Sequence, residues 1–165
     1  RDKGLWSAEL ATAACDAIQK KPEGQMEEHV KDPAVFLVEY ADGLKTATLM
    51  LSGYVSDFSY AARVDGQVQG VEFYLQNEGP FSHFGYLCRN VQDFFRTKKA
   101  PYPPERTLLT TGIIDAAMNS RHEDHRKIET PYLNVAYSSY DKLPQRPIGT
   151  RPVGASIDPQ APDII

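Results

Sequence analysis

The sequence predicts a mixed α/β fold with an open, mainly antiparallel sheet of about five strands and helices packed on one face. Two Asp-Gly pairs interrupt a run of apolar, β-branched residues, and two long helical patterns follow that run. Of the 165 residues, 41% are hydrophobic and 24% are charged, which is typical of a globular domain with its own core. We expect residues 1–140 to form this single domain.

The first predicted element is a helix from Ser7 to Gln19. Ser7 is a good N-cap, and Glu9 places a negative charge at the positive end of the helix. A pair of lysines followed by Pro22 ends the helix. Residues 22–33 are polar and predict a loop.

Four strands come next, and their short links predict an antiparallel meander. β-branched and aromatic residues favour extended chain over the ranges 34–40, 44–51, 58–64 and 68–75. The Asp-Gly pairs at 42–43 and 65–66 favour two tight turns of the same kind, with positive φ. Strand 34–40 is apolar on both faces, so one face needs a cover from elsewhere. A fifth strand is predicted at 132–137.

Two helices are predicted around the chain's Pro-rich break at 98–104. From Phe81 to Arg96 the apolar residues fall within an arc of about 140°, so we expect this aromatic face to pack on the sheet. Pro104 suits the start of the second helix, which runs to about Arg121. Residues 141–165 are rich in proline and predict an extended tail.

Net charge and missing motifs exclude several classes of function. A net charge of −4 argues against nucleic acid or an anionic membrane as a partner, and no apolar run reaches the length of a membrane span. The sequence contains no G-x-G-x-x-G, G-x-x-x-x-G-K-[ST], G-x-S-x-G or H-E-x-x-H motif. We expect no cofactor within this chain, because only a tight glycine turn lets the backbone approach the pyrophosphate of a dinucleotide. We also expect no metal within this chain.

The two cysteines, Cys15 and Cys88, lie in predicted helices and are interpreted as buried free thiols. Without C-x-x-C spacing they cannot form a zinc site by themselves. Free thiols indicate a reducing compartment, and we expect a cytoplasmic location. Because the chain begins with Arg1, we expect it to be a fragment of a longer polypeptide.

His83, Tyr86 and Arg106 are the candidate substrate-facing residues. His83 and Tyr86 lie beside the aromatic helix face, where the helix start favours a neutral imidazole; a simple packing role for His83 stays open. Arg106 follows a helix start, where the macrodipole disfavours a cation, so it predicts a specific acceptor.

Two further charged groups have simpler interpretations. The run from His122 to His125 contains H-x-x-H spacing, but it follows a helix end among basic residues, so we interpret it as a solvated loop rather than a metal site. Arg63 and Glu72, on opposite sides of the second Asp-Gly turn, predict a surface ion pair across the strands.

The segment at 101–137, PYPPERTLLTTGIIDAAMNSRHEDHRKIETPYLNVAY, resembles the C-terminal segment of Gfo/Idh/MocA-type oxidoreductases. The segments HFGYLCRNVQDFFRTKKAPYP and VEYADGLKTATLMLSGYV are similar to that family's preceding helix and first sheet hairpin. This resemblance covers roughly residues 1–140 and is most specific over 81–137. It implies an open antiparallel sheet whose free face makes the oligomer interface, next to an N-terminal Rossmann domain that binds NAD or NADP.

The family's E-K-P motif with its catalytic lysine, and its downstream Asp/His motif, are absent from this sequence. The resemblance therefore implies a substrate-side and oligomerisation domain of an NAD(P)-dependent oxidoreductase acting on a sugar-like or polyol substrate, with no catalysis by this chain alone. It implies an upstream Rossmann domain of the same polypeptide and further copies of the chain as partners. Two alternatives stay open: a non-catalytic assembly module, and a small enzyme using a His–acid pair at His83 or His125.

Overall fold

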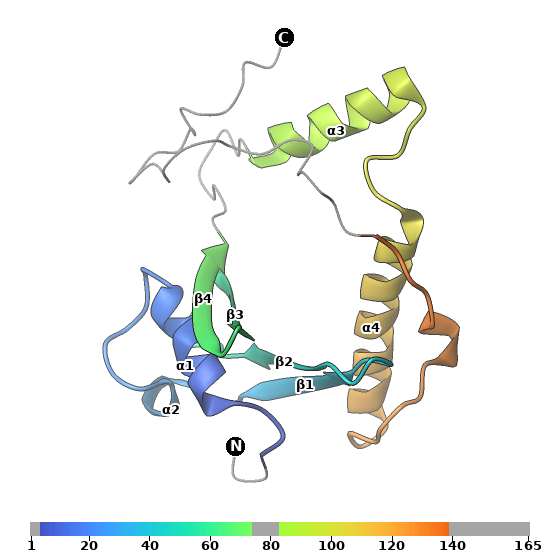
Figure 1. Ribbon diagram of the computed structural model, residues 1–165. Coiled ribbons are helices and arrows are strands. Elements are labelled where there is room, and N and C mark those ends of the chain that lie inside the picture. Colours follow the sequence, from blue (N-terminus) through green and yellow to red (C-terminus); the bar gives the residue numbers. More distant parts are fainter. Residues whose placement is uncertain (1–3, 74–82, 139–165) are drawn as a thin grey trace. The chain divides into compact units, whose positions relative to one another are not determined.

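A computed structural model describes residues 4–73 and 83–138 of the chain, which divides into two compact units, residues 1–74 and 75–165. The first unit contains α1 (Ala8–Ala17), α2 (Met26–His29), β1 (Ala34–Glu39), β2 (Lys45–Met50), β3 (Phe58–Val64) and β4 (Gln67–Phe73). The second contains α3 (His83–Thr97), α4 (Pro104–His122) and the 3-10 helix η1 (Pro131–Leu133). This mixture of helices and antiparallel strands confirms the α/β class (Figure 1).

Helix α1 confirms the first predicted helix and its cap. The Ser7 hydroxyl accepts a hydrogen bond from the backbone N–H of Leu10 at 3.2 Å, which satisfies a backbone donor that the helix start leaves free. The helix packs against β3 and β4 in the first unit. Its buried residues, together with the one that follows its end, form much of the small core of this unit: Ala11, Cys15 and Ile18.

The four strands pair as two separate antiparallel hairpins among the described residues, β1 with β2 and β3 with β4. Their positions agree with the four predicted strands, but the expected single meander is not formed. The two turns also differ in kind. Asp65 and Gly66 both have positive φ, at 49° and 78°, whereas in the first turn only Gly43 does, at 89°, while Asp42 accepts a hydrogen bond from the N–H of Leu44.

The link between the hairpins explains why β2 and β3 do not pair. The chain turns at Leu51, whose carbonyl accepts a hydrogen bond from the N–H of Tyr54 at 3.0 Å. Tyr54 is buried, and its hydroxyl donates to the carbonyl of Gly24 at 3.1 Å. Its ring also stacks on His29, with 5.5 Å between centroids. These contacts hold the link against the α2 region. The link therefore does not form a short hairpin turn that would pair β2 with β3.

Helix α2 was not predicted, since four residues carry little periodic pattern. It is stabilised by a capping box in which Gln25 and Glu28 satisfy each other's backbone groups.

Helices α3 and α4 of the second unit confirm the two predicted helices. The predicted fifth strand at 132–137 is wrong, because residues 131–133 form η1. Pro131 fixes a helix-compatible φ at the first position of η1, and Leu133 is buried against α4, beside Gly112. The predicted tail at 141–165 lies outside the described residues. Among the described residues, no helix combines the length and apolar character needed to cross a membrane.

Candidate functional site

The three predicted substrate-facing residues all lie on the helices of the second unit. His83 is the first residue of α3, and its side chain lies outside the described part of the chain. Tyr86 is half-buried on α3, and Arg106 is exposed in the first turn of α4. The guanidinium carbon of Arg106 lies 5.2 Å from the centroid of the Tyr102 ring, a cation–π contact. The sequence predicted a specific acceptor for the Arg106 guanidinium, and in the structure this group lies over the aromatic ring of Tyr102.

A small apolar cavity of about 100 Å³ lies between α3 and the link to α4. Its walls are mostly apolar, and they include Leu87, Val91, Phe94 and Tyr102. Tyr86 and Arg106, the two candidates whose side chains the structure describes, line neither this cavity nor the polar cavity of the first unit. The substrate-facing role of His83, Tyr86 and Arg106 therefore stays a prediction.

The run from His122 to His125 lies at the end of α4, with Asp124 and His125 at positive φ. The side chain of Arg126 donates a hydrogen bond to the Glu123 carboxylate, and this bond lowers the pKa of Glu123 below its usual value. Glu123 is thus tied to a cation on the same loop. In the part of the chain that the structure describes, no three His, Cys, Asp or Glu side chains are grouped as a metal site would need.

One side of the β3–β4 hairpin is an exposed apolar surface, which we call the hairpin face. In the observed register its residues are paired across the strands, so their side chains share one side of the sheet. Phe58, Tyr60 and Phe73 are 63%, 55% and 52% exposed. The hairpin face comprises Phe58, Tyr60, Ala62, Val64, Gln67, Gln69, Val71 and Phe73. None of these residues is charged.

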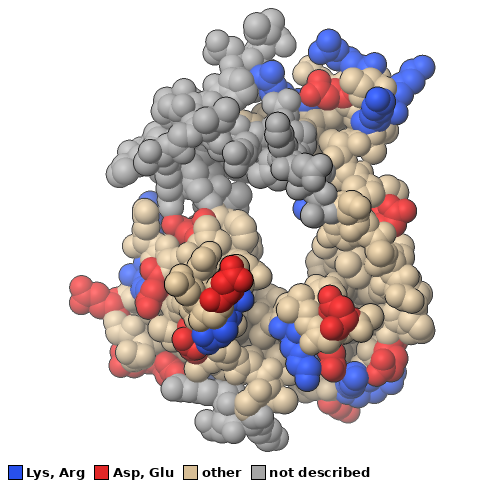
Figure 2. All heavy atoms as spheres, viewed as in Figure 1, with Lys and Arg blue, Asp and Glu red and all other residues tan. Residues whose placement is uncertain are grey.

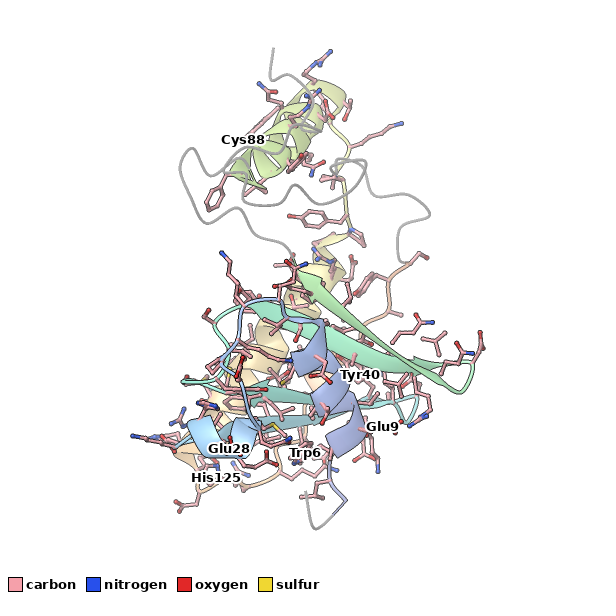
Figure 3. All side chains as sticks on the ribbon, turned by 90° about the vertical axis from the view of Figure 1, so that its left-hand side faces the viewer. Trp6, Glu9, Glu28, Tyr40, Cys88 and His125 are labelled. Atoms are coloured by element: carbon pink, nitrogen blue, oxygen red, sulfur yellow. The ribbon has the colours of Figure 1, made fainter. Side chains whose placement is uncertain are left out.

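The other side of the same hairpin faces α1 and carries the charges. Arg63 forms an ion pair there with Glu9 of α1 and donates a hydrogen bond to the carbonyl of Gly66 (Figure 3 labels Glu9). The predicted pair with Glu72 is wrong, because the register sets Arg63 opposite Val68 and Glu72 opposite Ser59. In Figure 2, acidic and basic side chains are interspersed over this unit, so its visible surface is not dominated by one sign of charge.

A polar cavity of about 180 Å³ lies beside α1, bounded by residues 24–27 and by Tyr54. Cys15 lines it and is 7% exposed, and burial is the main cause that raises the pKa of its thiol. The prediction of a buried free thiol is confirmed for Cys15. It is wrong for Cys88, which is free but exposed on α3 (Figure 3).

No protein-family model, curated protein or solved structure matches this chain.

Neither the hairpin face nor the polar cavity was predicted from the sequence. The hairpin face had a signal, because apolar residues alternate along Phe58, Tyr60, Ala62 and Val64 and such alternation indicates a sheet with one apolar side. The cavity had none, since Tyr54 and Cys15 are distant in sequence and meet only through the fold.

Proposed function

We propose that this chain is the substrate-side and oligomerisation part of an NAD(P)-dependent oxidoreductase that acts on a sugar-like or polyol substrate. In this proposal a Rossmann domain of the same polypeptide binds NAD or NADP, and the present chain holds the substrate and joins the subunits. Positioning of substrate against nicotinamide is its contribution to the reaction. The hairpins would then align as one open antiparallel sheet in the assembled enzyme.

The order and bounds of the elements support this proposal. The segment that resembles Gfo/Idh/MocA oxidoreductases implies a helix, a Pro-rich link and a second apolar helix, and α3 and α4 occupy those positions. The hairpin β1–β2 lies where the resemblance implies the first sheet hairpin. In this proposal the cofactor binds to other polypeptide, because the sequence contains no glycine-rich dinucleotide turn.

Two measurements test the redox assignment. Calorimetric titration of this chain with NAD⁺ or NADP⁺ is expected to give no binding heat. The gene sequence upstream of Arg1 is expected to encode a strand–glycine turn–helix unit. Binding of either nucleotide by this chain alone, or an upstream sequence without such a unit, would contradict the assignment.

A second candidate function is a non-catalytic assembly module, and the hairpin face favours it. Phe and Tyr side chains each bury roughly 150–250 Å² when covered, so three of them at half exposure or more leave on the order of 300 Å² of open aromatic surface. The largest apolar patch on a typical monomer is about 300–600 Å² and is often functional. An uncharged surface can also meet its own copy across a twofold axis without like-charge repulsion.

Sedimentation velocity tests the self-association that both candidates require. We expect the wild-type chain to form a dimer, and we expect Tyr60→Asp to be monomeric, because it places a charge in the centre of the interface. Gln19→Asp adds the same charge at an exposed position just after α1 and should leave the dimer intact. A monomeric wild type, or equal dimerisation of both variants, rules out association through the hairpin face.

A further inference from the structure

We propose that helix α3 binds the surface of an anionic lipid bilayer, with its apolar side among the headgroups and its basic end at the lipid phosphates. With 15 residues, α3 is shorter than the roughly 20 residues that a membrane span needs, so it would lie along the bilayer and not cross it. The proposal concerns the second unit alone and does not depend on the redox assignment above.

The apolar side of α3 is continuous and open to solvent. Successive helix residues are rotated by about 100°, which places five of them within an arc of about 120°. We call this surface the α3 face: Leu87, Cys88, Val91, Phe94 and Phe95. Leu87, Val91 and Phe95 are 51%, 44% and 75% exposed. Within the second unit, none of the described elements packs extensively on α3, so this apolar surface is available to a partner.

The α3 face continues into the small apolar cavity at the link to α4. Leu87, Val91 and Phe94 belong to the cavity wall, which Pro101 and Tyr102 complete from the link. Its volume of about 100 Å³ is below the roughly 300–1,000 Å³ of a typical ligand pocket. The surface as a whole, rather than the cavity, is therefore the part that would meet a partner.

Basic residues gather at the C-terminal end of the α3 face. Every charged residue between Phe94 and Pro104 is basic, and all three are exposed: Arg96, Lys98 and Lys99. In Figure 2, most of the charged side chains at this end of α3 are blue. An amphipathic helix with an aromatic apolar side and nearby basic residues is the pattern of helices that bind anionic bilayers.

Local charge decides such an attraction more than total charge does. The net charge of −4 led us to expect no anionic membrane as a partner. Salt screens charges that lie further apart than about 10 Å, however, so the lipid would respond mainly to the residues beside it. The same basic cluster favours lipid over a second copy of the chain, because the α3 of that copy carries the same positive charge.

Backbone hydrogen bonds fix the two lysines beside the α3 face. Lys98 has a positive φ of 57°, and its N–H donates to the carbonyl of Phe94 at 2.8 Å. The N–H of Lys99 donates to the hydroxyl of Thr97 at 3.3 Å. The chain thus brings both lysines to the end of the apolar surface. Long lysine side chains can extend from such a position to reach lipid phosphates.

Flotation of the full chain with lipid vesicles tests the proposal. We expect binding to vesicles that contain equal amounts of phosphatidylserine and phosphatidylcholine, and much weaker binding to vesicles of phosphatidylcholine alone. Raising the NaCl concentration from about 0.1 M to about 1 M should release most of the bound chain, because the screening length then falls from about 10 Å to about 3 Å.

A charge-reversed chain tests the role of the basic end. The double variant Lys98→Glu, Lys99→Glu should bind at least about 30-fold more weakly, because each lysine near an anionic surface contributes about a factor of five. The matched control is Lys20→Glu, Lys31→Glu, which makes the same change of charge at exposed positions of the first unit. This control should bind as the wild type does.

A single substitution tests the role of the apolar side. Phe95→Ser should weaken binding by about tenfold, because the aromatic ring no longer leaves water on binding. Phe95 is so exposed that its loss should leave the fold intact, which circular dichroism checks. Tyr132→Ser is the control, since Tyr132 is also exposed but lies on η1, and it should leave binding unchanged.

A fluorescent probe on Cys88 reports whether the α3 face itself meets the lipid. Cys88 is exposed (Figure 3), so it can carry a nitrobenzoxadiazole group, and peptide mass spectrometry confirms the labelled site. We expect a blue shift and a gain in intensity when anionic vesicles are added. An unchanged spectrum of the vesicle-bound chain would overturn the proposal, because another surface would then hold the lipid.

Three further results would also overturn it. These are no binding to anionic vesicles, equal binding to both vesicle types, and equal binding of the two lysine double variants. If the wild type did not float but Phe95→Ser abolished a dimer in sedimentation, a second copy of the chain would be the occupant of the α3 face.

Discussion

Gly70 of β4 lies so close to Ala13 of α1 that a Cβ atom on residue 70 would be 2.3 Å from the Ala13 carbonyl oxygen. The obstructing atom belongs to the helix backbone, which cannot rotate away as a side chain would. Glycine at this position therefore allows α1 to approach the sheet, and it fixes which side of the hairpin the helix covers. The apolar hairpin face is left on the other side for that reason.

Gly70→Ala is expected to destabilise the first unit. The added methyl group must push α1 away from the strands, and such overpacking costs roughly 1–3 kcal/mol. Urea unfolding followed by circular dichroism measures the loss. Gln69→Ala is the control, because residue 69 lies on the hairpin face, and its effect should stay within about 0.5 kcal/mol. If Gly70→Ala were as stable as the wild type, α1 could not be seated at this point.

Gly112 and Leu133 are expected to show strong coupling in the second unit. A Cβ atom on residue 112 would be 2.4 Å from Cδ2 of Leu133, and Leu133 is 7% exposed. We expect Leu133→Ala alone to cost roughly 2 kcal/mol or more. Gly112→Ala should destabilise the wild type by displacing Leu133. In the Leu133→Ala background it should instead stabilise by roughly 0.5–1 kcal/mol, because alanine is the better helix former.

The free energies of unfolding of the four chains in this cycle give the coupling directly. A change of sign between the two backgrounds is the expected signature of the contact. Additive effects would mean that η1 does not dock on Gly112 in solution.

The ion pair between Glu9 and Arg63 is expected to contribute little, because both side chains are substantially exposed. A double-mutant cycle with Glu9→Gln and Arg63→Gln should give a coupling energy of under about 1 kcal/mol, and added salt should reduce it. The same cycle with Glu72→Gln in place of Glu9→Gln should be additive, since the register separates Glu72 from Arg63. Coupling to Glu72 that exceeds coupling to Glu9 would contradict the observed register.

The local elements of this fold were predictable from the sequence because their signals are local. Ser7 caps α1 as expected, and the positive φ of Gly43 and of Gly66 follows from the Asp-Gly pairs. The helical periods of α3 and α4 likewise gave their ranges to within a few residues. Each of these signals depends on neighbours in the chain, so no tertiary information was needed.

The features that were missed depend on contacts between distant residues. Tyr54 separates the two hairpins through its bond to Gly24, 30 residues away, and nothing in the local pattern indicates that bond. The sequence at 132–137 has a strand pattern, but Leu133 is buried on α4, and this contact outweighs the local preference. The polar cavity was missed for the same reason, because its wall combines α1, α2 and Tyr54.

Cys15 is expected to make the stability of the first unit depend on alkaline pH. Burial raises the pKa of its thiol above the ordinary value of 9.0, so folding favours the neutral form. A group whose folded-state pKa is raised contributes its full stability below the unfolded pKa, and it loses that contribution as pH rises through the folded-state pKa. We expect the free energy of unfolding of the wild type to fall more steeply above pH 9 than that of Cys15→Ser, which carries no thiol at position 15.

Urea unfolding of both proteins across this pH range measures the difference. Other titrating groups cancel because both chains share them. Parallel curves would show that the Cys15 thiol ionises as easily in the folded chain as in the unfolded one.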